Sequence, residues 1–436
     1  MIREILATLL LILFAASAGA QPEQSAPLLL ERGREHYRKG EYDQAIKFYS
    51  EAIRLDGTNS KAFVSRGTAW GQKGDWDKAI KDFDEAIRLE PKNAWAWYNR
   101  GYAHENKERL DKAIKDFDEA IRLNPKHVLA LSNRGACRVA IGETEQGFQD
   151  FDEAIRLEPE NRQSRFGRAY YLTQLKQYDK AEADFTAIIR IEPTDAVNYC
   201  NRGTNRLCLG EFDGALRDLT EGIRLDPKQA YLFASRAKAW VGKGEQSKAL
   251  NDANEAVRLD PNDPQNYHIR ADIRVRMQNY DSALLDLNRG LAKAPDETHL
   301  LTLRGKVWMF LQEEEKGLTD FEKVLKADPN NAPALGGRAL IRACASDSKL
   351  RNGKQALDDA KRACELTESK EPYYFEALAA AYAEVGNFDE AVKWQRKAVE
   401  DEKYSKLQYG GAEGRMKLYQ AKMPCRVPNF LSPRVD

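Results

Sequence analysis

The sequence predicts an all-α solenoid built from helix-turn-helix units, and three observations predict it. The octapeptide DFDEAIRL occurs verbatim at residues 82–89, 116–123 and 150–157, so each copy begins 34 residues after the previous one. Prolines recur with the same period, and glycines recur midway between them. A fixed period of this length indicates one helical supersecondary unit stacked on copies of itself.

The prolines and glycines predict where the helices end. Proline cannot continue a helix, so each recurring proline marks the end of a second helix. These prolines are Pro91, Pro125, Pro159, Pro193, Pro227, Pro261, Pro295 and Pro329. Two residues later stand side chains that can cap the next helix, namely Asn93, Asn161, Asp195, Asp263 and Asn331. The glycines suit the turn after each first helix, and they are Gly40, Gly74, Gly142, Gly210, Gly244 and Gly386.

Small residues recur where the two helices of a unit are expected to touch. Gly101 in a first helix faces Ala113 in the second, and Phe117 fills the space beside them. Gly147 and Gly317 replace this alanine in two later units. Because glycine weakens a helix, we expect these two units to be softer.

These residues resemble the tetratricopeptide repeat family. Counted from Ala94, the matching residues are Trp97 at position 4, Gly101 at 8, Ala113 at 20, Phe117 at 24, Ala120 at 27 and Pro125 at 32. The resemblance implies a right-handed superhelical solenoid of about eleven units over residues 21–404. The units start near Ala26, Ser60, Ala94, Val128, Arg162, Ala196, Ala230, Pro264, Thr298, Ala332 and Pro372. Residues 405–436 are expected to form a capping helix near Glu413–Lys422 and an extended tail.

The first 20 residues have the pattern of a secretory signal peptide. Arg3 precedes an apolar run, and Ala18-Gly19-Ala20 suits cleavage before Gln21. We therefore expect an exported protein, periplasmic or extracellular after cleavage. The alternatives are an uncleaved anchor, which would be the protein's contact with a membrane, or a buried first helix.

Charge and cysteine content restrict the possible partners and bonds. The chain has 68 Lys and Arg residues against 68 Asp and Glu residues, so no overall field favours nucleic acid. Its cysteines are Cys137, Cys200, Cys208, Cys344, Cys364 and Cys425, none in CxxC spacing. Cys344 and Cys364 flank an irregular loop of the tenth unit, so they either form a disulfide or are small buried residues.

An arginine recurs at position 7, where the family commonly has leucine. The residues are Arg32, Arg66, Arg100, Arg134, Arg168, Arg202, Arg236, Arg270, Arg304 and Arg338. An aspartate recurs at position 23, as Asp82, Asp116, Asp150, Asp184, Asp218, Asp252, Asp286, Asp320 and, after an insertion, Asp359. In an antiparallel hairpin these positions face each other, which predicts an Arg-Asp pair inside units two to ten. A ladder from each arginine to the aspartate of a neighbouring unit fits nearly as well. A cationic row for an acidic ligand is disfavoured, because the carboxylates neutralise it.

Family resemblance implies that the first helices line a concave groove. Candidate groove residues are Trp95, Tyr98, Asn99, Tyr102, Asn133, Phe166, Tyr170, Asn201 and Tyr231. Aromatic rings beside amides suit an extended peptide or a sugar chain. The alternative is that half of these rings serve packing between repeats. Some family members grip a chaperone's C-terminal carboxylate with lysines, asparagines and an arginine. Here only the asparagines match, so we reject that clamp.

No catalytic pattern stands out. The histidines His36, His104, His127, His268 and His299 are scattered, and HExxH and GxSxG are absent from the sequence. Acidic pairs such as Asp84-Glu85 are expected on a solvated helix face. We therefore expect a scaffold that needs no metal or cofactor and binds a protein or peptide. The alternative is a carbohydrate-binding protein of the cell envelope.

Overall fold

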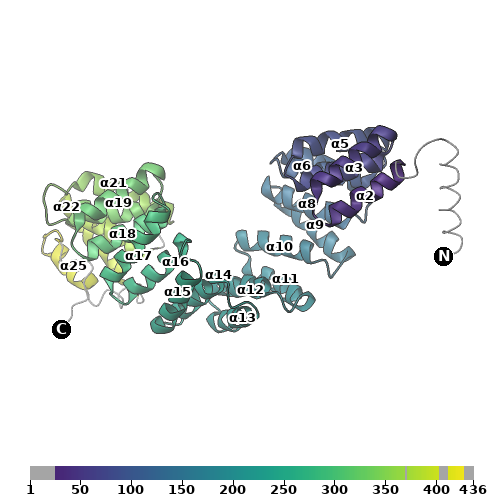
Figure 1. Cartoon of the computed structure of the whole chain (residues 1–436). Coiled ribbons are helices and arrows are strands. Elements are labelled where there is room, and N and C mark those ends of the chain that lie inside the picture. Colours follow the sequence, from purple (N-terminus) through teal and green to yellow (C-terminus); the bar gives the residue numbers. More distant parts are fainter. Residues whose placement is uncertain (1–24, 369–370, 402–410, 427–436) are drawn as a thin grey trace, which may run out of the picture. The chain divides into compact units, whose positions relative to one another are not determined.

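The computed structural model describes residues 25–368, 371–401 and 411–426 (Figure 1). These residues form eleven consecutive helix pairs and a single last helix, α25 (Gly411–Gln420). The expected signal peptide and the tail beyond residue 426 lie outside the described residues. Among the helices in these ranges, none is both long and apolar enough to cross a membrane.

Each first helix begins at the residue from which the sequence analysis counts a unit. The first helices are α2 (Ala26–Arg38), α4 (Ser60–Gln72), α6 (Ala94–Glu105), α8 (Val128–Ala140), α10 (Arg162–Gln174), α12 (Ala196–Leu209), α14 (Ala230–Gly242), α16 (Pro264–Arg276), α18 (Thr298–Phe310), α20 (Ala332–Cys344) and α22 (Pro372–Glu384). The second helices are α3 (Tyr42–Leu55), α5 (Trp76–Leu89), α7 (Leu110–Leu123), α9 (Thr144–Leu157), α11 (Tyr178–Ile191), α13 (Phe212–Leu225), α15 (Gln246–Leu259), α17 (Tyr280–Lys293), α19 (Glu314–Ala327), α21 (Gly353–Leu366) and α23 (Phe388–Val399).

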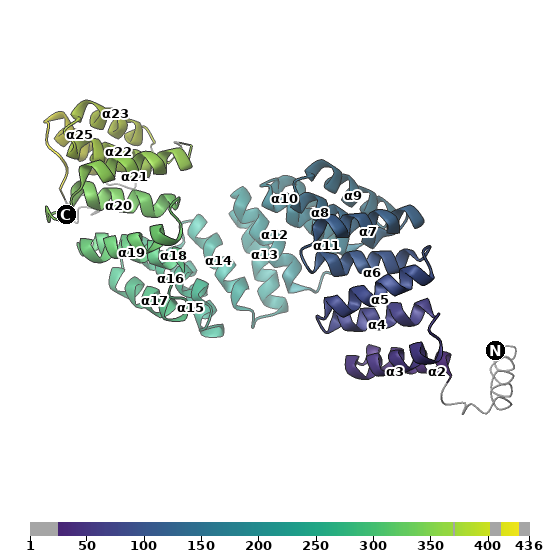
Figure 2. The ribbon, with the colours of Figure 1, turned by 90° about the horizontal axis from the view of Figure 1, so that it is seen from above.

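Contacts divide the chain into two compact units, residues 1–205 and 206–436. Within each unit the helix pairs follow one another in chain order (Figure 2). The division falls inside α12, although the 34-residue period continues through it. Nothing in the repeat pattern marks this point, because the pattern records the packing inside a repeat and not the strength of contact between repeats.

The helix ends have the geometry that the sequence predicts. Asn93 accepts a hydrogen bond from the amide of Ala96, and Asp263 caps its helix through the amide of Gln265. The six midway glycines all have positive φ, between 76° and 92°. A residue with a Cβ is strained in that conformation, so glycine is favoured where the first helix turns back.

Close approach of the two helices explains the small residues. A Cβ added to Gly101 would lie 2.7 Å from Cε1 of Phe117 and 3.2 Å from the carbonyl oxygen of Ala113. Phe117 and Ala113 are completely buried. The glycine therefore makes room for the phenyl ring that fills the centre of the repeat.

The structure gives Gly147 a packing role that the sequence analysis did not anticipate. A Cβ there would lie 2.6 Å from Cγ2 of Val139 and 2.7 Å from the carbonyl oxygen of Gly135. Helices α8 and α9 thus approach too closely for the alanine found in other repeats. Gly317 is in a similar place, with the carbonyl oxygen of Gly305 3.0 Å from the added atom.

Gly147→Ala is therefore expected to destabilise the protein, by about 1–3 kcal/mol, since overpacking outweighs the gain in helix propensity. Gly414→Ala is the control, because Gly414 also lies within a helix and nothing lies within 4 Å of the added Cβ. The control should be neutral or stabilising. Thermal unfolding followed by circular dichroism measures both, and a stabilising Gly147→Ala would contradict the packing argument.

The position-7 arginines bind the position-23 aspartates of their own repeats. Arg100 donates from Nε to Oδ2 of Asp116 at 2.9 Å and from Nη2 to Oδ1 at 2.7 Å. Eight such pairs occur: Arg66–Asp82, Arg100–Asp116, Arg134–Asp150, Arg168–Asp184, Arg236–Asp252, Arg270–Asp286, Arg304–Asp320 and Arg338–Asp359. The last is kept although an insertion separates its partners by 21 residues instead of 16. Arg202 and Asp218 belong to different compact units, and their pairing stays a prediction.

The same arginines also bind the preceding repeat. Nη1 of Arg100 donates to Asp84 at 2.6 Å, and Nη1 of Arg134 donates to Asp118 at 2.7 Å. In other repeats the acceptor at this position is Ser50, Asp152, Thr186, Thr220, Asn254 or Asn288. The predicted pair within the repeat is therefore formed, whereas the acceptor in the preceding repeat stands at position 25 and is not the position-23 aspartate of the alternative ladder. Asp84 lies on a solvated face, with its side chain 53% exposed, and it also accepts this hydrogen bond.

A double-mutant cycle on Arg100 and Asp116 tests this coupling. Each of Arg100→Gln and Asp116→Asn should destabilise the protein by about 3 kcal/mol, because each leaves a largely buried partner without its charge complement. The double variant should lose at least about 1 kcal/mol less than the sum of the single losses.

The exposed pair Arg88–Glu85 is the matched control, since its side chains are 66% and 34% exposed. Its cycle should show coupling below about 0.5 kcal/mol. Simple addition of the two losses at Arg100 and Asp116 would show that the pair is not coupled.

Helix α25 covers α23 at the end of the chain, starting two residues before the expected capping helix. Its Arg415 forms a buried ion pair with Glu376 of α22. Nε2 of Gln395 donates to Glu376 and to the carbonyl oxygen of Ala412, both at 3.1 Å. The cap is therefore held by buried polar contacts as well as by apolar ones.

The proposed bridge between Cys344 and Cys364 is absent. Both cysteines are buried and unbridged, and the thiol of Cys364 donates to the carbonyl oxygen of Tyr374. Cys344 instead forms a side-chain hydrogen bond with Cys425, which follows the capping helix. The sequence could not anticipate this contact, because the two residues belong to segments with no shared repeat register.

Candidate functional site

The first helices of three successive repeats form one surface in the first compact unit. Helix α6 contacts α8, and α8 contacts α10. We call this surface the α6–α8–α10 face. Among its aromatic residues, Trp95 is 53% exposed, Tyr102 40% and Tyr170 48%. Phe166 of α10 is also exposed. Large exposed rings on neighbouring helices are typical of a binding surface.

The rings on α6 pack against one another. Trp95 meets Tyr98 edge to face with ring centroids 5.7 Å apart, and Tyr98 stacks on Tyr102 at 6.4 Å. His127 lies against both Trp95 and Tyr98, at 4.6 Å and 4.9 Å. Nδ1 of His127 accepts the amide of Ala130 and so caps α8, which fixes the imidazole in place. The cluster is therefore held rigid before any ligand arrives.

The other expected groove residues have different roles. Tyr98 and Asn133 are buried, and Tyr98 also packs on the core ring of Phe117. Asn99 and Asn201 are partly buried. Tyr231 belongs to the second compact unit, so the structure does not join it to this face.

Glu105 is the functional candidate that the sequence analysis missed. It is the last residue of α6, and its Oε2 accepts a hydrogen bond from Nδ2 of Asn133 at 3.1 Å. Nε2 of Gln163 donates to Oδ1 of Asn133 at 3.3 Å, so one polar chain crosses α6, α8 and α10. The available signal was its place on a first helix, which the family resemblance predicts to line the groove. The predicted groove residues, however, were only aromatic residues and asparagines.

The surroundings of Glu105 disfavour its charge. Burial raises the pKa of this carboxyl from 4.5 to about 7, and the hydrogen bond from Asn133 opposes that rise. In the part of the chain that the structure describes, no lysine, arginine or histidine forms an ion pair with it. The neighbouring cation Lys107 pairs with Asp77 instead, at 2.6 Å. The negative end of the helix dipole also lies at this end of α6.

Glu105→Gln should therefore stabilise the protein above neutral pH. The raised pKa means that the folded state holds a proton which the unfolded state releases above about pH 4.5, so stability falls as pH rises from about 4.5 to 7. At about pH 8 the variant should be more stable by about 1–3 kcal/mol, and at about pH 4.5 it should equal the parent. Thermal unfolding at both pH values measures this difference. Equal stability at about pH 8 would show that the carboxylate carries no such cost.

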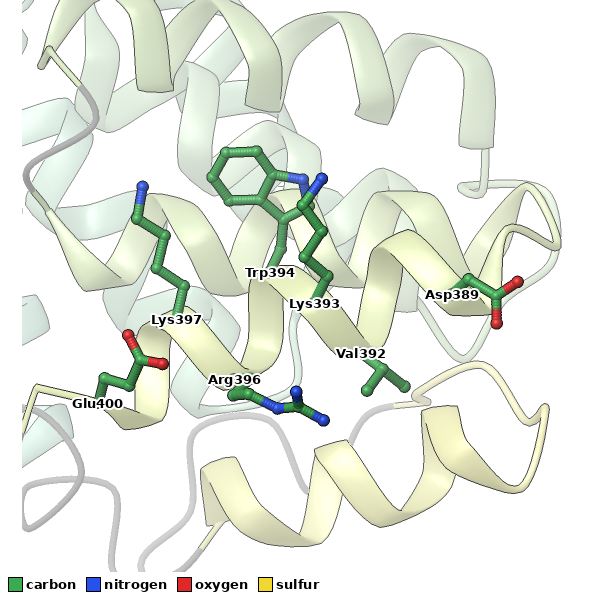
Figure 3. A pocket seen from close by; sticks show the side chains of 7 residues that line it. All are labelled: Asp389, Val392, Lys393, Trp394, Arg396, Lys397 and Glu400. Atoms are coloured by element: carbon green, nitrogen blue, oxygen red, sulfur yellow. The ribbon is translucent and has the colours of Figure 1, made fainter.

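A pocket on α23 is a weaker candidate for a functional site than the α6–α8–α10 face. It has a volume of about 480 Å³, and its lining residues are Asp389, Val392, Lys393, Trp394, Arg396, Lys397 and Glu400. Figure 3 shows these side chains projecting from successive turns of the one helix. Lys397 already lies over the rings of Phe375 and Trp394, at 4.4 Å and 5.1 Å. Within the described ranges, no group of three or more His, Cys, Asp or Glu residues is placed to hold a metal ion.

Stacked helix pairs with one exposed aromatic face define an α-helical repeat protein with a surface suited to binding. Models of the tetratricopeptide repeat match residues 26–59, 64–128, 138–196, 200–264 and 374–401. The chain belongs to the tetratricopeptide repeat family. Comparison with curated proteins finds no match.

Solved structures of other repeat proteins are similar to this chain. A tetratricopeptide repeat protein from Parabacteroides merdae is 21% identical over 57% of this chain and 98% of its own, with a TM-score of 0.46. Yeast Tom70 is 14% identical over 91% of this chain and 96% of its own, with a TM-score of 0.45. YrrB, described as having an unusual peptide-binding site, is 19% identical over 43% and 97%, with a TM-score of 0.36.

Proposed function

We propose that the protein is a non-catalytic scaffold that binds a protein or an extended peptide on the α6–α8–α10 face. The observation that carries this proposal is that Trp95, Tyr102 and Tyr170 are each at least 40% exposed, on the first helices of the third and fifth repeats, which both contact α8. Covering an exposed aromatic ring with a partner removes its apolar surface from water, and this lowers the free energy of the complex.

A peptide in extended form suits this face better than a compact ligand. Trp95 and Tyr102 stand on α6 and Tyr170 stands on α10, so a ligand that covers all three must run across α8, which lies between them in the stack. Gln163 of α10 is exposed, so its amide would offer a donor and an acceptor to backbone groups of a bound segment. This combination of rings and amides is typical of the core of a protein interface.

We also propose that the protein acts outside the cytoplasm. Support comes from residues 1–20, where a charged start, an apolar run and a small-residue cleavage pattern follow one another. Mass spectrometry of the protein isolated from its own cell should find Gln21 as the first residue. A mature chain that retains residues 1–20 would contradict cleavage.

Replacing Trp95, Tyr102 and Tyr170 together with alanine should abolish peptide binding without unfolding the protein. Tyr98 is left in place because it is buried and its loss would open a cavity. Short random peptides selected against the full chain serve as probes, and their Kd values should rise at least about tenfold in the triple variant.

Leu285→Ala is the control, since Leu285 is 59% exposed in the second compact unit and should leave every Kd unchanged. Circular dichroism should be the same for all variants. Peptides that bind the triple variant as tightly as the parent would refute the proposed face. Retention of cell-wall polysaccharide, lost in the triple variant, would assign the face to sugars instead.

A further inference from the structure

We propose that the α6–α8–α10 face selects peptides by a lysine or arginine side chain, whose cationic group pairs with the carboxylate of Glu105. This inference rests on the proposed function, and it adds the chemical class of the side chain that the face recognises.

Glu105 stands out when the eleven repeats are compared at the same position. The equivalent residues in the other repeats are Tyr37, Gly71, Val139, Thr173, Leu207, Val241, Val275, Met309, Ala343 and Ala383. None of these is charged, so the architecture of the repeat does not need a carboxylate here. A charge found in one repeat alone can distinguish one ligand from another, whereas residues shared by every repeat cannot.

Burying the carboxyl group of Glu105 disfavours its charged form, and no cation among the described residues pairs with it to offset this cost. The carboxyl group is partly buried at the C-terminal end of a helix, where the helix dipole opposes negative charge. Its one protein hydrogen bond comes from the neutral amide of Asn133. Two cations close to it in the sequence pair elsewhere, Arg100 with Asp84 and Asp116, and Lys107 with Asp77. A cation supplied by a ligand would offset the penalty.

The rings beside Glu105 complete a site for a cation. Tyr98 and Tyr102 on the same helix are stacked with an interplanar angle of 21°, and Trp95 adds an exposed ring beside them. The faces of aromatic rings attract ammonium and guanidinium groups, while their apolar area suits the methylene chain of lysine or arginine. Carboxylate and rings together therefore fit a long cationic side chain better than a neutral one.

The groups that face Glu105 from each packed helix stay neutral near physiological pH. Burial raises the pKa of Tyr98 on α6, of Cys137 on α8 to about 12, and of Tyr171 on α10. Glu105 is thus the group among them that changes charge around pH 7. Because only the ionised carboxylate attracts a cation, binding should strengthen as pH rises through that value.

The test uses peptides selected from a random library against the full chain. We expect the peptides that depend on Trp95, Tyr102 and Tyr170 to contain lysine or arginine. Replacing that residue with glutamine should raise Kd at least about tenfold, as should Glu105→Gln in the protein. Combining both changes should add little further, because each removes the same contact.

Two controls separate this contact from general charge effects. Glu119→Gln removes a carboxylate from the exposed pair with Arg122 on α7 and should leave Kd unchanged. For the parent protein, Kd should be about tenfold weaker at about pH 6 than at about pH 8, and Glu105→Gln should abolish this dependence. The pH profile needs no variant, so it tests the contact even if a substitution disturbs folding.

The outcomes distinguish this inference from the proposed function. Selected peptides that need the aromatic residues but are acidic or neutral, or that bind Glu105→Gln as tightly as the parent, would overturn the role of Glu105 and leave the binding face intact. If no selected peptide depends on the aromatic residues, the proposed function and this inference both fail.

Discussion

The stacking of most repeats depends on one guanidinium group, that of the position-7 arginine. Nε and Nη2 of the position-7 arginine bind an aspartate on the second helix of the same repeat, while Nη1 binds a residue on the second helix of the preceding repeat. Arginine suits this task because its planar group presents donors in fixed directions. Lysine would offer a single ammonium and could not reproduce this fixed set of contacts. The arginine thus sets both the register within a helix pair and the join between pairs.

These two sets of contacts, within a repeat and to the preceding repeat, explain why the octapeptide DFDEAIRL is copied so closely. Asp116 binds the arginine of its own repeat, Asp118 binds the arginine of the next, and Phe117 fills the space beside Gly101. The remaining acidic and basic residues pair on the surface, as Glu119 does with Arg122. Because these contacts involve the second helices, the outward side chains of the first helices are free to vary from repeat to repeat.

The candidate site consists of these variable side chains on the first helices. The α6–α8–α10 face carries several exposed rings and, at the position of Glu105, a carboxyl group that the other ten repeats lack. Glu105 joins α6 to α8 through Asn133, although the other ten repeats stack with an uncharged residue at this position. A buried carboxyl group that the other repeats do not need is best explained by the ligand it would bind.

The sequence by itself determined the repeat, its period, the helix starts, the glycine turns and the arginine with its aspartate, because each follows from contacts at fixed spacings within one chain segment. Only the tertiary structure showed that the same arginine reaches the preceding repeat, that Gly147 marks a closer helix approach, and that Cys344 meets Cys425 and not Cys364. It also decided that Tyr98 and Asn133 are buried and that Glu105 forms no ion pair with the residues that the structure describes. These features depend on which side chains neighbouring helices bring into contact. The spacing of residues along the sequence does not determine the distances between residues on different helices.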